Sequence, residues 1–251
     1  MATGSRRYRE IDAARGVAIL MMVTFHAVYD LDHFGSAGIG ATSGFWRMFA
    51  QATASLFLLL VGVSLTLSHS RASRRLGGKT LPLKYVRRGA RIFLYGMAIT
   101  AVTWLFVPNG VIVFGVLHCI GLSIILAYPL LRHRWLALPF GLACIAAGIV
   151  VSNVEMGTNL LLWLGIRTGD MYMFDYFPLL PWLGVVLLGV FLGNVLYPDG
   201  ERRFRLPDPS GWPMTGLLAW MGRHSLAIYL VHQPLLVAML MAADAIEIGL
   251  V

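Results

Sequence analysis

The stretch Arg9-Glu10-Ile11-Asp12-Ala13-Ala14-Arg15-Gly16-Val17-Ala18-Ile19-Leu20-Met21-Met22-Val23-Thr24-Phe25-His26 decides how the rest of the chain is interpreted. It begins with charged residues, is apolar from Val17 to Phe25, and ends on a histidine. This pattern is typical of a helix that enters a membrane from a charged surface, and an ionisable side chain inside a membrane is functional by default. At 1.5 Å of rise per residue, Arg15 and His26 lie about 16 Å apart along one helix. We therefore expect Arg15 at a membrane surface and His26 well inside the membrane.

The composition of the whole chain supports the same interpretation. Hydrophobic residues make up 58% of the 251 residues and charged residues 13%, with a mean hydropathy of +0.73, whereas an ordinary soluble domain is about 25% charged. Apolar segments of roughly twenty residues, without the alternation of barrel strands, predict an all-α polytopic transmembrane helical bundle. We predict one transmembrane domain over residues 1–251. The net charge of +8 does not indicate nucleic-acid binding, because the basic residues cluster at the ends of apolar segments, as topology signals do.

The apolar segments predict about seven spans in the lipid bilayer. These are residues 11–31, 45–68, 85–108, 111–131, 135–151, 177–196 and 217–242. The longer loop 152–176 contains an apolar run, Leu160–Leu164, that is too short to span and predicts a helix lying in the membrane interface. Two prolines, Pro178 and Pro181, predict an irregular start of the sixth span. Small residues that allow close helix packing, within the chain or between copies in a homo-oligomer, are Gly62, Gly184, Gly189 and Gly193.

The distribution of Lys and Arg predicts the orientation of the bundle. If the N-terminus is cytoplasmic, only Arg47 and Arg167 of the 20 Lys and Arg residues lie on the outer side. Cytoplasmic loops are enriched in these residue types. We therefore predict a multi-pass protein of the cell membrane with a cytoplasmic N-terminus and an outer C-terminus.

Histidines inside predicted spans are the candidate catalytic residues: His26, His118 and His232. Helical rise places all of them at about one depth, in the outer half of a hydrocarbon layer about 30 Å thick. An imidazole there can act as a general base or a nucleophile, or it can tie helices together by hydrogen bonds. A common depth favours the functional interpretation. The cysteines, Cys119 and Cys144, show no metal-ligand spacing, and we predict no metal site.

Arginines near the cytoplasmic ends of the first and third spans are candidate phosphate ligands: Arg15, Arg87, Arg88 and Arg91. Arg87 and Arg91 are four residues apart and share one helix face. A fork of guanidinium groups suits phosphate or pyrophosphate, although such side chains also reach out to lipid headgroups. Asp12, three residues before Arg15, is the expected ion-pair partner of Arg15.

Acidic and aromatic residues form a predicted rim at the outer mouth of the bundle. The candidate substrate-binding residues are Tyr29, Asp30, Asp175 and Tyr176, with Asp32, His33 and Asp170 nearby. Such a rim suits a hydroxyl-rich or amine-bearing acceptor. Acidic residues also accumulate wherever basic residues are excluded, so a general topological origin is the alternative.

Several segments together resemble the catalytic domain of heparan-α-glucosaminide N-acetyltransferases and its prokaryotic relatives. They are the opening stretch to His26, Gly115–Gly121 and Asp175–Gly184. In addition, Ser225–Pro234 is similar to the last span of the membrane acyltransferase-3 group. The resemblance covers nearly the whole chain. It implies transfer of an acyl group from cytoplasmic acyl-CoA, acetyl-CoA above all, to an acceptor at the other face, with a first-span histidine as the essential residue.

The resemblance has a departure at the catalytic position. By the acyltransferase-3 pattern the essential residue matches His26, whereas the lysosomal enzyme has Asn there and a histidine further along, near the position of His33 but at a different spacing. The chain is also shorter and has no lumenal domain, so we expect a sugar, glycan or other small acceptor instead of heparan.

The expected mechanism joins the two membrane faces. The phosphates of CoA bind the arginines while the pantetheine arm brings the thioester to the histidines. His26 then acts as general base or as nucleophile, and His118 or His232 polarises the carbonyl or orients His26. The alternatives are a non-enzymatic membrane protein that binds haem or a metal through its histidines and a small transporter with a histidine proton relay. The absence of obvious inverted repeats argues against the transporter.

Overall fold

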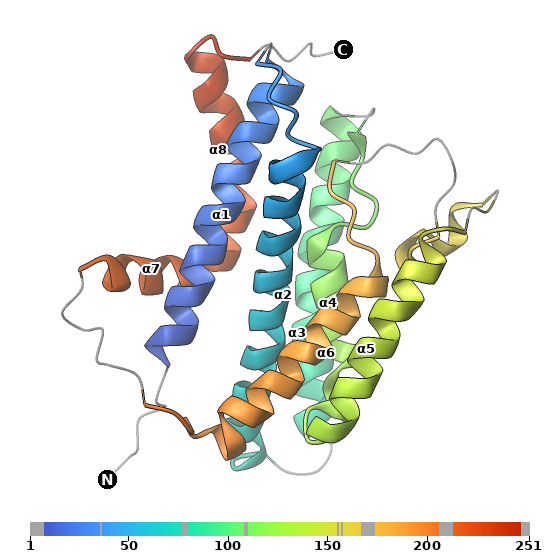
Figure 1. Ribbon diagram of the computed structural model, residues 1–251, viewed down its shortest axis with the longest axis vertical. Coiled ribbons are helices and arrows are strands. Elements are labelled where there is room, and N and C mark those ends of the chain that lie inside the picture. Colours follow the sequence, from blue (N-terminus) through green and yellow to red (C-terminus); the bar gives the residue numbers. More distant parts are fainter. Residues whose placement is uncertain are drawn as a thin grey trace. The chain divides into compact units, whose positions relative to one another are not determined.

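The computed structural model describes residues 8–35, 37–76, 80–107, 110–154, 156, 158–166, 174–205 and 213–246, and its regular elements over these residues are all helices (Figure 1). Within this part of the chain, six helices are long and apolar enough to cross a membrane. They are α1 (Arg9–His33), α2 (Gly44–Ser73), α3 (Thr80–Phe106), α5 (Arg134–Val151), α6 (Leu179–Leu196) and α8 (Ser225–Ala242). The predicted all-α polytopic bundle is confirmed. The chain divides into two compact units: unit 1 comprises Met1–Leu60 and Leu206–Val251, and unit 2 comprises Val61–Arg205.

Unit 1 is built on α1, which contacts both α8 and the short helix α7 (Pro213–Arg223). The contact with α7 depends on two glycines. A Cβ on Gly16 would collide with the backbone carbonyl of Leu218, and a Cβ on Gly222 would collide with that of Asp12. The helices therefore touch backbone to backbone, which explains why a glycine directly follows Arg15 in the opening stretch.

The predicted last span, residues 217–242, is wrong in its first part. The structure has two helices there, because α7 ends at Arg223 and α8 begins at Ser225. Figure 1 shows α7 extending to one side of α1, at a steep angle to both α1 and α8. With 11 residues, α7 is about 16 Å long, too short to span a bilayer. Its side chains Met214, Leu217 and Trp220 are exposed, as in a helix that lies in a membrane interface. The prediction merged the two helices because apolar residues continue on both sides of the break.

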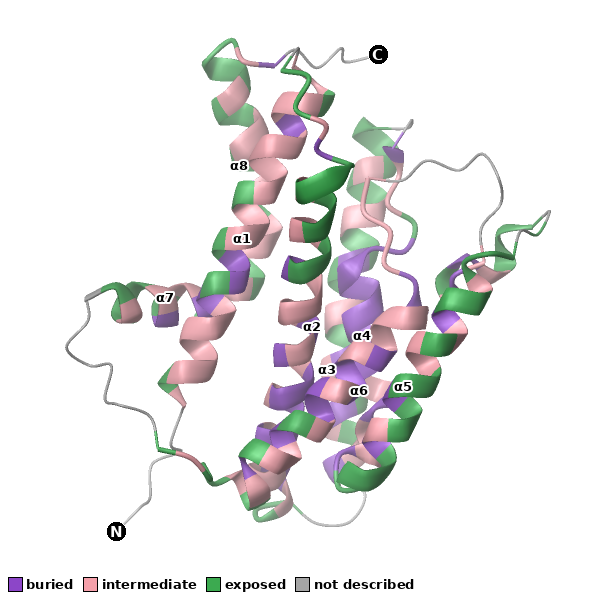
Figure 2. Cartoon of the chain, in the orientation of Figure 1, coloured by how far each residue is buried: buried purple, intermediate pink, exposed green. Residues whose placement is uncertain are grey.

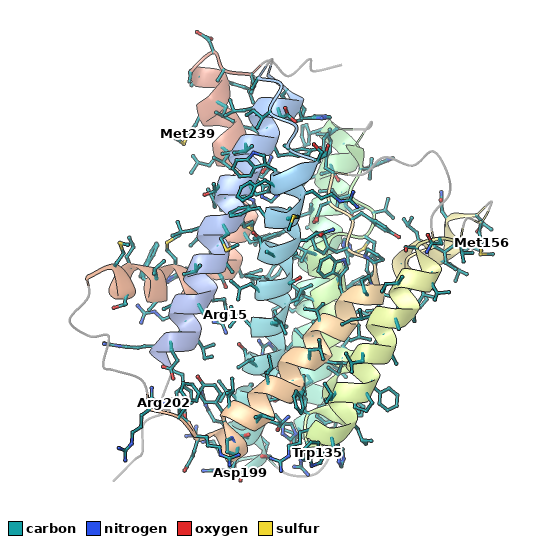
Figure 3. All side chains as sticks on the ribbon, viewed as in Figure 1. Arg15, Trp135, Met156, Asp199, Arg202 and Met239 are labelled. Carbon is teal, nitrogen blue, oxygen red and sulfur yellow. The ribbon has the colours of Figure 1, made fainter. Side chains whose placement is uncertain are left out.

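Unit 2 pairs α3 with α4 (Val116–Leu126) and α5 with α6, and α4 also contacts α6. Figure 2 shows that α4 is buried along most of its length. Two glycines let α3 and α4 approach closely: a Cβ on Gly89 would lie 2.5 Å from the carbonyl oxygen of Gly121, and one on Gly121 would lie 2.7 Å from that of Gly89. The pair α5 and α6 is less buried than α4, since α5 is exposed along one side from Trp135 onward. Figure 3 labels Trp135 near the start of α5 and Met156 beyond its other end.

The fourth predicted span, residues 111–131, is also shorter than expected. The helix begins only at Val116 and has 11 residues, followed by the 3-10 helix η2 (Tyr128–Leu130). At about 16 Å it is shorter than the hydrocarbon layer. We predicted about seven spans. Over the described ranges, the structure has six helices long enough to span and one shorter apolar helix, α4. The sequence 111–115 precedes the helix as irregular backbone, which hydropathy does not distinguish from a helical turn.

Two smaller predictions in unit 2, a short helix in the long loop and an irregular start of the sixth span, are confirmed, whereas the interface location of that short helix stays a prediction. The apolar run Leu160–Leu164 lies in the 3-10 helix η3 (Asn159–Leu164), and the start of α6 is irregular, with Leu180 at φ −100° and ψ 128° and a cis Leu180–Pro181 bond. The small residues noted in the sequence serve packing inside this unit: a Cβ on Gly62 would meet α6 at Val186, and one on Gly184 would meet Gly141. Homo-oligomer formation and a single domain over residues 1–251 stay predictions.

Candidate functional site

Two histidines from opposite ends of the chain meet in unit 1. His26 on α1 and His232 on α8 have ring centroids 4.8 Å apart, with the rings edge to face at 73°. His26 is half-buried, and His232 is only 8% exposed. The structure therefore joins two of the predicted catalytic histidines, although 206 positions of sequence numbering separate them by subtraction of residue numbers.

Backbone carbonyls fix the tautomer of both rings. Nδ1 of His26 lies 2.9 Å from the carbonyl oxygen of Met22, and Nδ1 of His232 lies 2.7 Å from that of Tyr229. A carbonyl oxygen only accepts hydrogen bonds, so each Nδ1 carries the proton in the neutral ring and each Nε2 presents a lone pair. Nε2 of His232 is buried and has no hydrogen-bond partner among the described residues. The pair is thus arranged with basic nitrogens available for chemistry.

A carboxylate and an amide lie beside the histidine pair. Asp30 is one helical turn after His26 and is fully buried. Nε2 of Gln233 donates to both carboxylate oxygens of Asp30, at 2.8 Å and 3.0 Å. Since Gln233 is the residue after His232, the Asp30–Gln233 contact and the His26–His232 contact are adjacent along the interface of α1 with α8. A buried carboxylate held in this way fixes the register of the two helices and therefore the spacing of the imidazoles.

The remaining rim residues of α1 make local contacts. The ring of Tyr29 is stacked on that of His33, with centroids 5.4 Å apart and an interplanar angle of 11°. The carboxylate of Asp32 accepts hydrogen bonds from the backbone of Ile39, Gly40 and Ala41 at 2.6, 3.0 and 2.8 Å. Asp32 therefore shapes the loop after α1. Asp170, the rim residue predicted from the long loop, lies outside the described residues.

Arg15 projects from α1, where Figure 3 labels it, and its guanidinium group contacts α7 in the same unit. Its Nη1 lies 3.1 Å from Oδ1 of Asp12, which confirms the predicted ion pair. The same nitrogen lies 3.5 Å from the carbonyl oxygen of Gly222. Along the continuous helix α1, Arg15 and His26 are about 16 Å apart, as expected from the sequence.

The third candidate, His118, belongs to unit 2 and has different surroundings. Its Nδ1 accepts a hydrogen bond from the backbone N–H of Gly115 at 3.2 Å, and its Nε2 lies 3.5 Å from Oγ1 of Thr100. The rings of Phe93 and Phe114 lie 5.0 Å and 5.4 Å from the imidazole, which is 1% exposed. Both nitrogens have partners, so the contacts favour a packing role. A catalytic role for His118 and a depth shared with the other two stay predictions.

The candidates Asp175 and Tyr176 hold the long loop against its neighbours in unit 2. Oδ2 of Asp175 accepts a hydrogen bond from the backbone N–H of Val116 at 3.1 Å, which places a carboxylate at the N-terminus of α4, where the helix dipole favours negative charge. The hydroxyl of Tyr176 donates to the carbonyl of Leu162 at 2.8 Å. These contacts give both residues a structural task, and their substrate-binding role stays a prediction.

The arginines predicted on the third span lie on α3 and differ in exposure. Arg87 and Arg91 are exposed, whereas Arg88 is half-buried and acts electrostatically on Tyr85. The exposed pair shares a helix face, as predicted from its spacing. Phosphate binding by these side chains stays a prediction.

The metal-binding alternative depends on a cluster of ligating side chains. Over the described ranges, no group of three or more His, Cys, Asp and Glu side chains is arranged to hold a metal ion.

Sequence reasoning missed the partners that orient the histidines. Gln233 occurs in the quoted motif Ser225–Pro234, yet its pairing with Asp30 depends on the register of two helices. The accepting carbonyls of Met22 and Tyr229 belong to residues with no polar signal in the apolar pattern. One signal was present: His26 and Asp30 are four residues apart, so both occupy one helix face.

Comparison with known proteins agrees with these observations. A model of the family described as heparan-alpha-glucosaminide N-acetyltransferase, catalytic, matches residues 7–234. This range includes all three candidate histidines and ends directly after Gln233, and it confirms the resemblance drawn from the four motifs. No curated protein and no solved structure matched the chain.

Proposed function

Because the chain belongs to the family of heparan-alpha-glucosaminide N-acetyltransferase catalytic domains, we propose that it transfers an acetyl group from cytoplasmic acetyl-CoA, or another acyl group from its CoA thioester, to an acceptor at the outer face of the cell membrane. The acceptor is a hydroxyl or amine of a sugar, glycan or small molecule. The coarser statement, a multi-pass membrane protein of acetyltransferase type, follows from the family and from six helices that are long and apolar enough to span.

The observation that carries the proposal is the histidine pair of unit 1. Acyl transfer needs a group that removes a proton from the acceptor, or a nucleophile that takes the acyl group first. His26 meets this need because its Nδ1–H bond to Met22 leaves Nε2 as the basic atom. Its half-buried position lets a substrate reach the ring, whereas His232 lies deeper.

In the first form of the mechanism, His26 is a general base. Nε2 takes the proton of the acceptor O–H or N–H while the acceptor atom bonds to the thioester carbonyl carbon. The carbon–sulfur bond then breaks, and the departing thiolate recovers the proton to give the CoA thiol. In the second form, Nε2 itself bonds to the carbonyl carbon and the carbon–sulfur bond breaks to release the thiolate. The acceptor oxygen or nitrogen then bonds to that carbon and displaces the neutral imidazole, while the acceptor's proton passes to the thiolate to give the CoA thiol. Detection of an acyl-enzyme in single-turnover experiments distinguishes the two forms.

His232 supports His26 in either form. Its ring edge lies against His26 at 4.8 Å between centroids, so it contributes a second imidazole dipole to the site and restricts the rotation of His26. The Asp30–Gln233 contact holds α8 in this register. We assign His232 and the Asp30–Gln233 contact to positioning. The other rim residues, Tyr29, Asp175 and Tyr176, stay on the acceptor side as proposed from the sequence.

Binding of the acyl donor, acyl-CoA, is assigned to the arginines. A guanidinium group binds phosphate with two parallel hydrogen bonds, so Arg15, Arg87, Arg88 and Arg91 are proposed to hold the phosphates of CoA at the cytoplasmic surface. Arg15 keeps its side chain ordered through Asp12 and the carbonyl of Gly222. About 16 Å along α1 separates it from His26, a length that the extended pantetheine arm covers.

The proposal is tested by replacing His26 in the purified full-length protein. His26→Ala removes the basic nitrogen, so transfer of labelled acetyl from acetyl-CoA to glucosamine or to a membrane glycan extract should fall by at least about 100-fold. CoA binding should be retained, because the arginines are untouched. The matched control is His224→Ala, an exposed histidine whose Nδ1 also bonds a backbone carbonyl, that of Trp220 at 2.9 Å. Undiminished transfer by His26→Ala would refute the assignment.

A further inference from the structure

A second polar cluster lies in unit 2, where α2 ends, α3 begins and η2 follows α4. Its centre consists of three aromatic side chains in mutual contact. The ring of Tyr85 lies 5.2 Å from that of Tyr128 and 6.0 Å from that of His69, and His69 lies 6.1 Å from Tyr128. Tyr85 is fully buried, and His69 is 5% exposed. We call these three residues the aromatic floor.

Positive charges surround the aromatic floor. Nζ of Lys84 lies 5.6 Å from the centroid of the Tyr85 ring and 3.5 Å from Oγ of Ser68. The charges that act on Lys84 are those of Arg88 and Arg71, and Arg132 acts on His69. Lys84 thus lies against the Tyr85 ring, and the charges of Arg88, Arg71 and Arg132 lie near enough to act on Lys84 or His69, although like charges repel at such range.

No carboxylate balances these cations in the part of the chain that the structure describes. The Arg15–Asp12 ion pair belongs to the other unit. Lys84, Arg88 and Arg71 are half-buried, so water screens their repulsion less than it does at an open surface. A gathering of half-buried cations without a counter-charge favours a bound anion.

The hydroxyl of Tyr85 is a second polar group inside this cluster. The oxygen is buried, and its near neighbour is the side chain of Ser68, which is not aligned well enough to satisfy the hydroxyl fully. Leaving a buried polar group without a partner costs about 1–3 kcal/mol, and buried hydroxyls are normally satisfied. A phenol O–H can donate to the oxygen of an anion, which is also what the surrounding cations attract.

We propose that the aromatic floor and its cations bind the phosphate group of an amphipathic ligand, either the nucleotide phosphates of acyl-CoA or the headgroup of an anionic phospholipid. The Tyr85 hydroxyl and the Lys84 ammonium donate to phosphate oxygens, and Arg88, one turn after Lys84 on α3, adds a guanidinium group. Tyr128 and His69 pack against the Tyr85 ring and hold it in place. The coenzyme source rests on the proposed function; the lipid source does not.

The experiment compares two conservative variants of the full-length protein in phosphatidylcholine nanodiscs. Tyr85→Phe removes only the hydroxyl, and Lys84→Gln removes only the charge. The matched controls are Tyr95→Phe, an exposed tyrosine of the same helix, and Arg134→Gln, an exposed cation at the start of α5. The dissociation constant of CoA is measured by calorimetry, retention of phosphatidylglycerol by native mass spectrometry, and folding by the melting temperature.

With the coenzyme as ligand, both variants weaken CoA binding by about tenfold, the loss expected for one hydrogen bond to a charged group. With the lipid as ligand, both lose most retained phosphatidylglycerol while CoA binding is unchanged. Either result supports the phosphate site. If folded Tyr85→Phe and Lys84→Gln bind both probes as the controls do, the phosphate site is refuted. His26-dependent acetyl transfer, measured in parallel, remains in that case, so the proposed function is judged separately.

Discussion

The histidines of the two units show how the same side chain is prepared for different tasks. In unit 1, the Nδ1 atoms of His26 and His232 face backbone carbonyls, so the proton sits on Nδ1 and Nε2 is basic. In unit 2, Nδ1 of His118 faces the backbone N–H of Gly115, so Nδ1 is the acceptor and Nε2 carries the proton.

The cause of the difference is the position of each residue in its helix. His26 and His232 lie inside long helices, where the accessible backbone group is a carbonyl of the preceding turn. His118 is the third residue of α4, and its ring reaches back to satisfy an N–H at the start of the helix, which has no partner within the helix. A histidine near a helix start is thus drawn into capping, whereas one in mid-helix keeps a nitrogen for chemistry.

The largest effect on activity is expected for the histidine pair of unit 1. His232→Ala removes the imidazole that lies against His26 and leaves His26 free to rotate, so transfer of acetyl from acetyl-CoA should fall by about 100-fold, the loss that misplacement of a catalytic group produces. The rate is measured per folded protein, with CoA binding as a check on the donor side. Recovery of the rate in His232→Gln would show that a polar side chain of similar length suffices and that no second imidazole is needed.

For His118 in unit 2, we expect a substitution to lower the stability of the protein and to leave the rate of acetyl transfer unchanged. His118→Ala leaves the Gly115 N–H without its acceptor and opens a cavity between Phe93 and Phe114, which together should cost about 3 kcal/mol. Thermal unfolding in detergent should shift to lower temperature, while transfer per folded molecule stays close to that of the unchanged protein. A rate lowered as strongly as in His232→Ala, at an unchanged melting temperature, would place His118 in the catalytic site after all.

The sequence could predict the parts of this arrangement that lie along one helix. The Arg15–Asp12 pair and the distance from Arg15 to His26 follow from helical spacing alone. The pairing of Asp30 with Gln233 could not be predicted in the same way, because it depends on how two helices are aligned and joins residues 203 positions apart. The break before Ser225 was missed for a related reason: Gly222 permits contact between α7 and α1, and hydropathy carries no information on such contacts.

The smallest expected effect separates the two nitrogens of His118. Oγ1 of Thr100 lies 3.5 Å from Nε2 of His118 and donates to the carbonyl of Ile112, so Thr100→Val removes both contacts but keeps the volume. We expect a loss of about 1 kcal/mol in unfolding free energy, against about 3 kcal/mol for His118→Ala, because the bond of Nδ1 to Gly115 remains. Thr100→Ser, which keeps the hydroxyl, should melt close to the unchanged protein. Equal losses in Thr100→Val and His118→Ala would mean that the Nε2 side holds the ring and that capping of α4 contributes little.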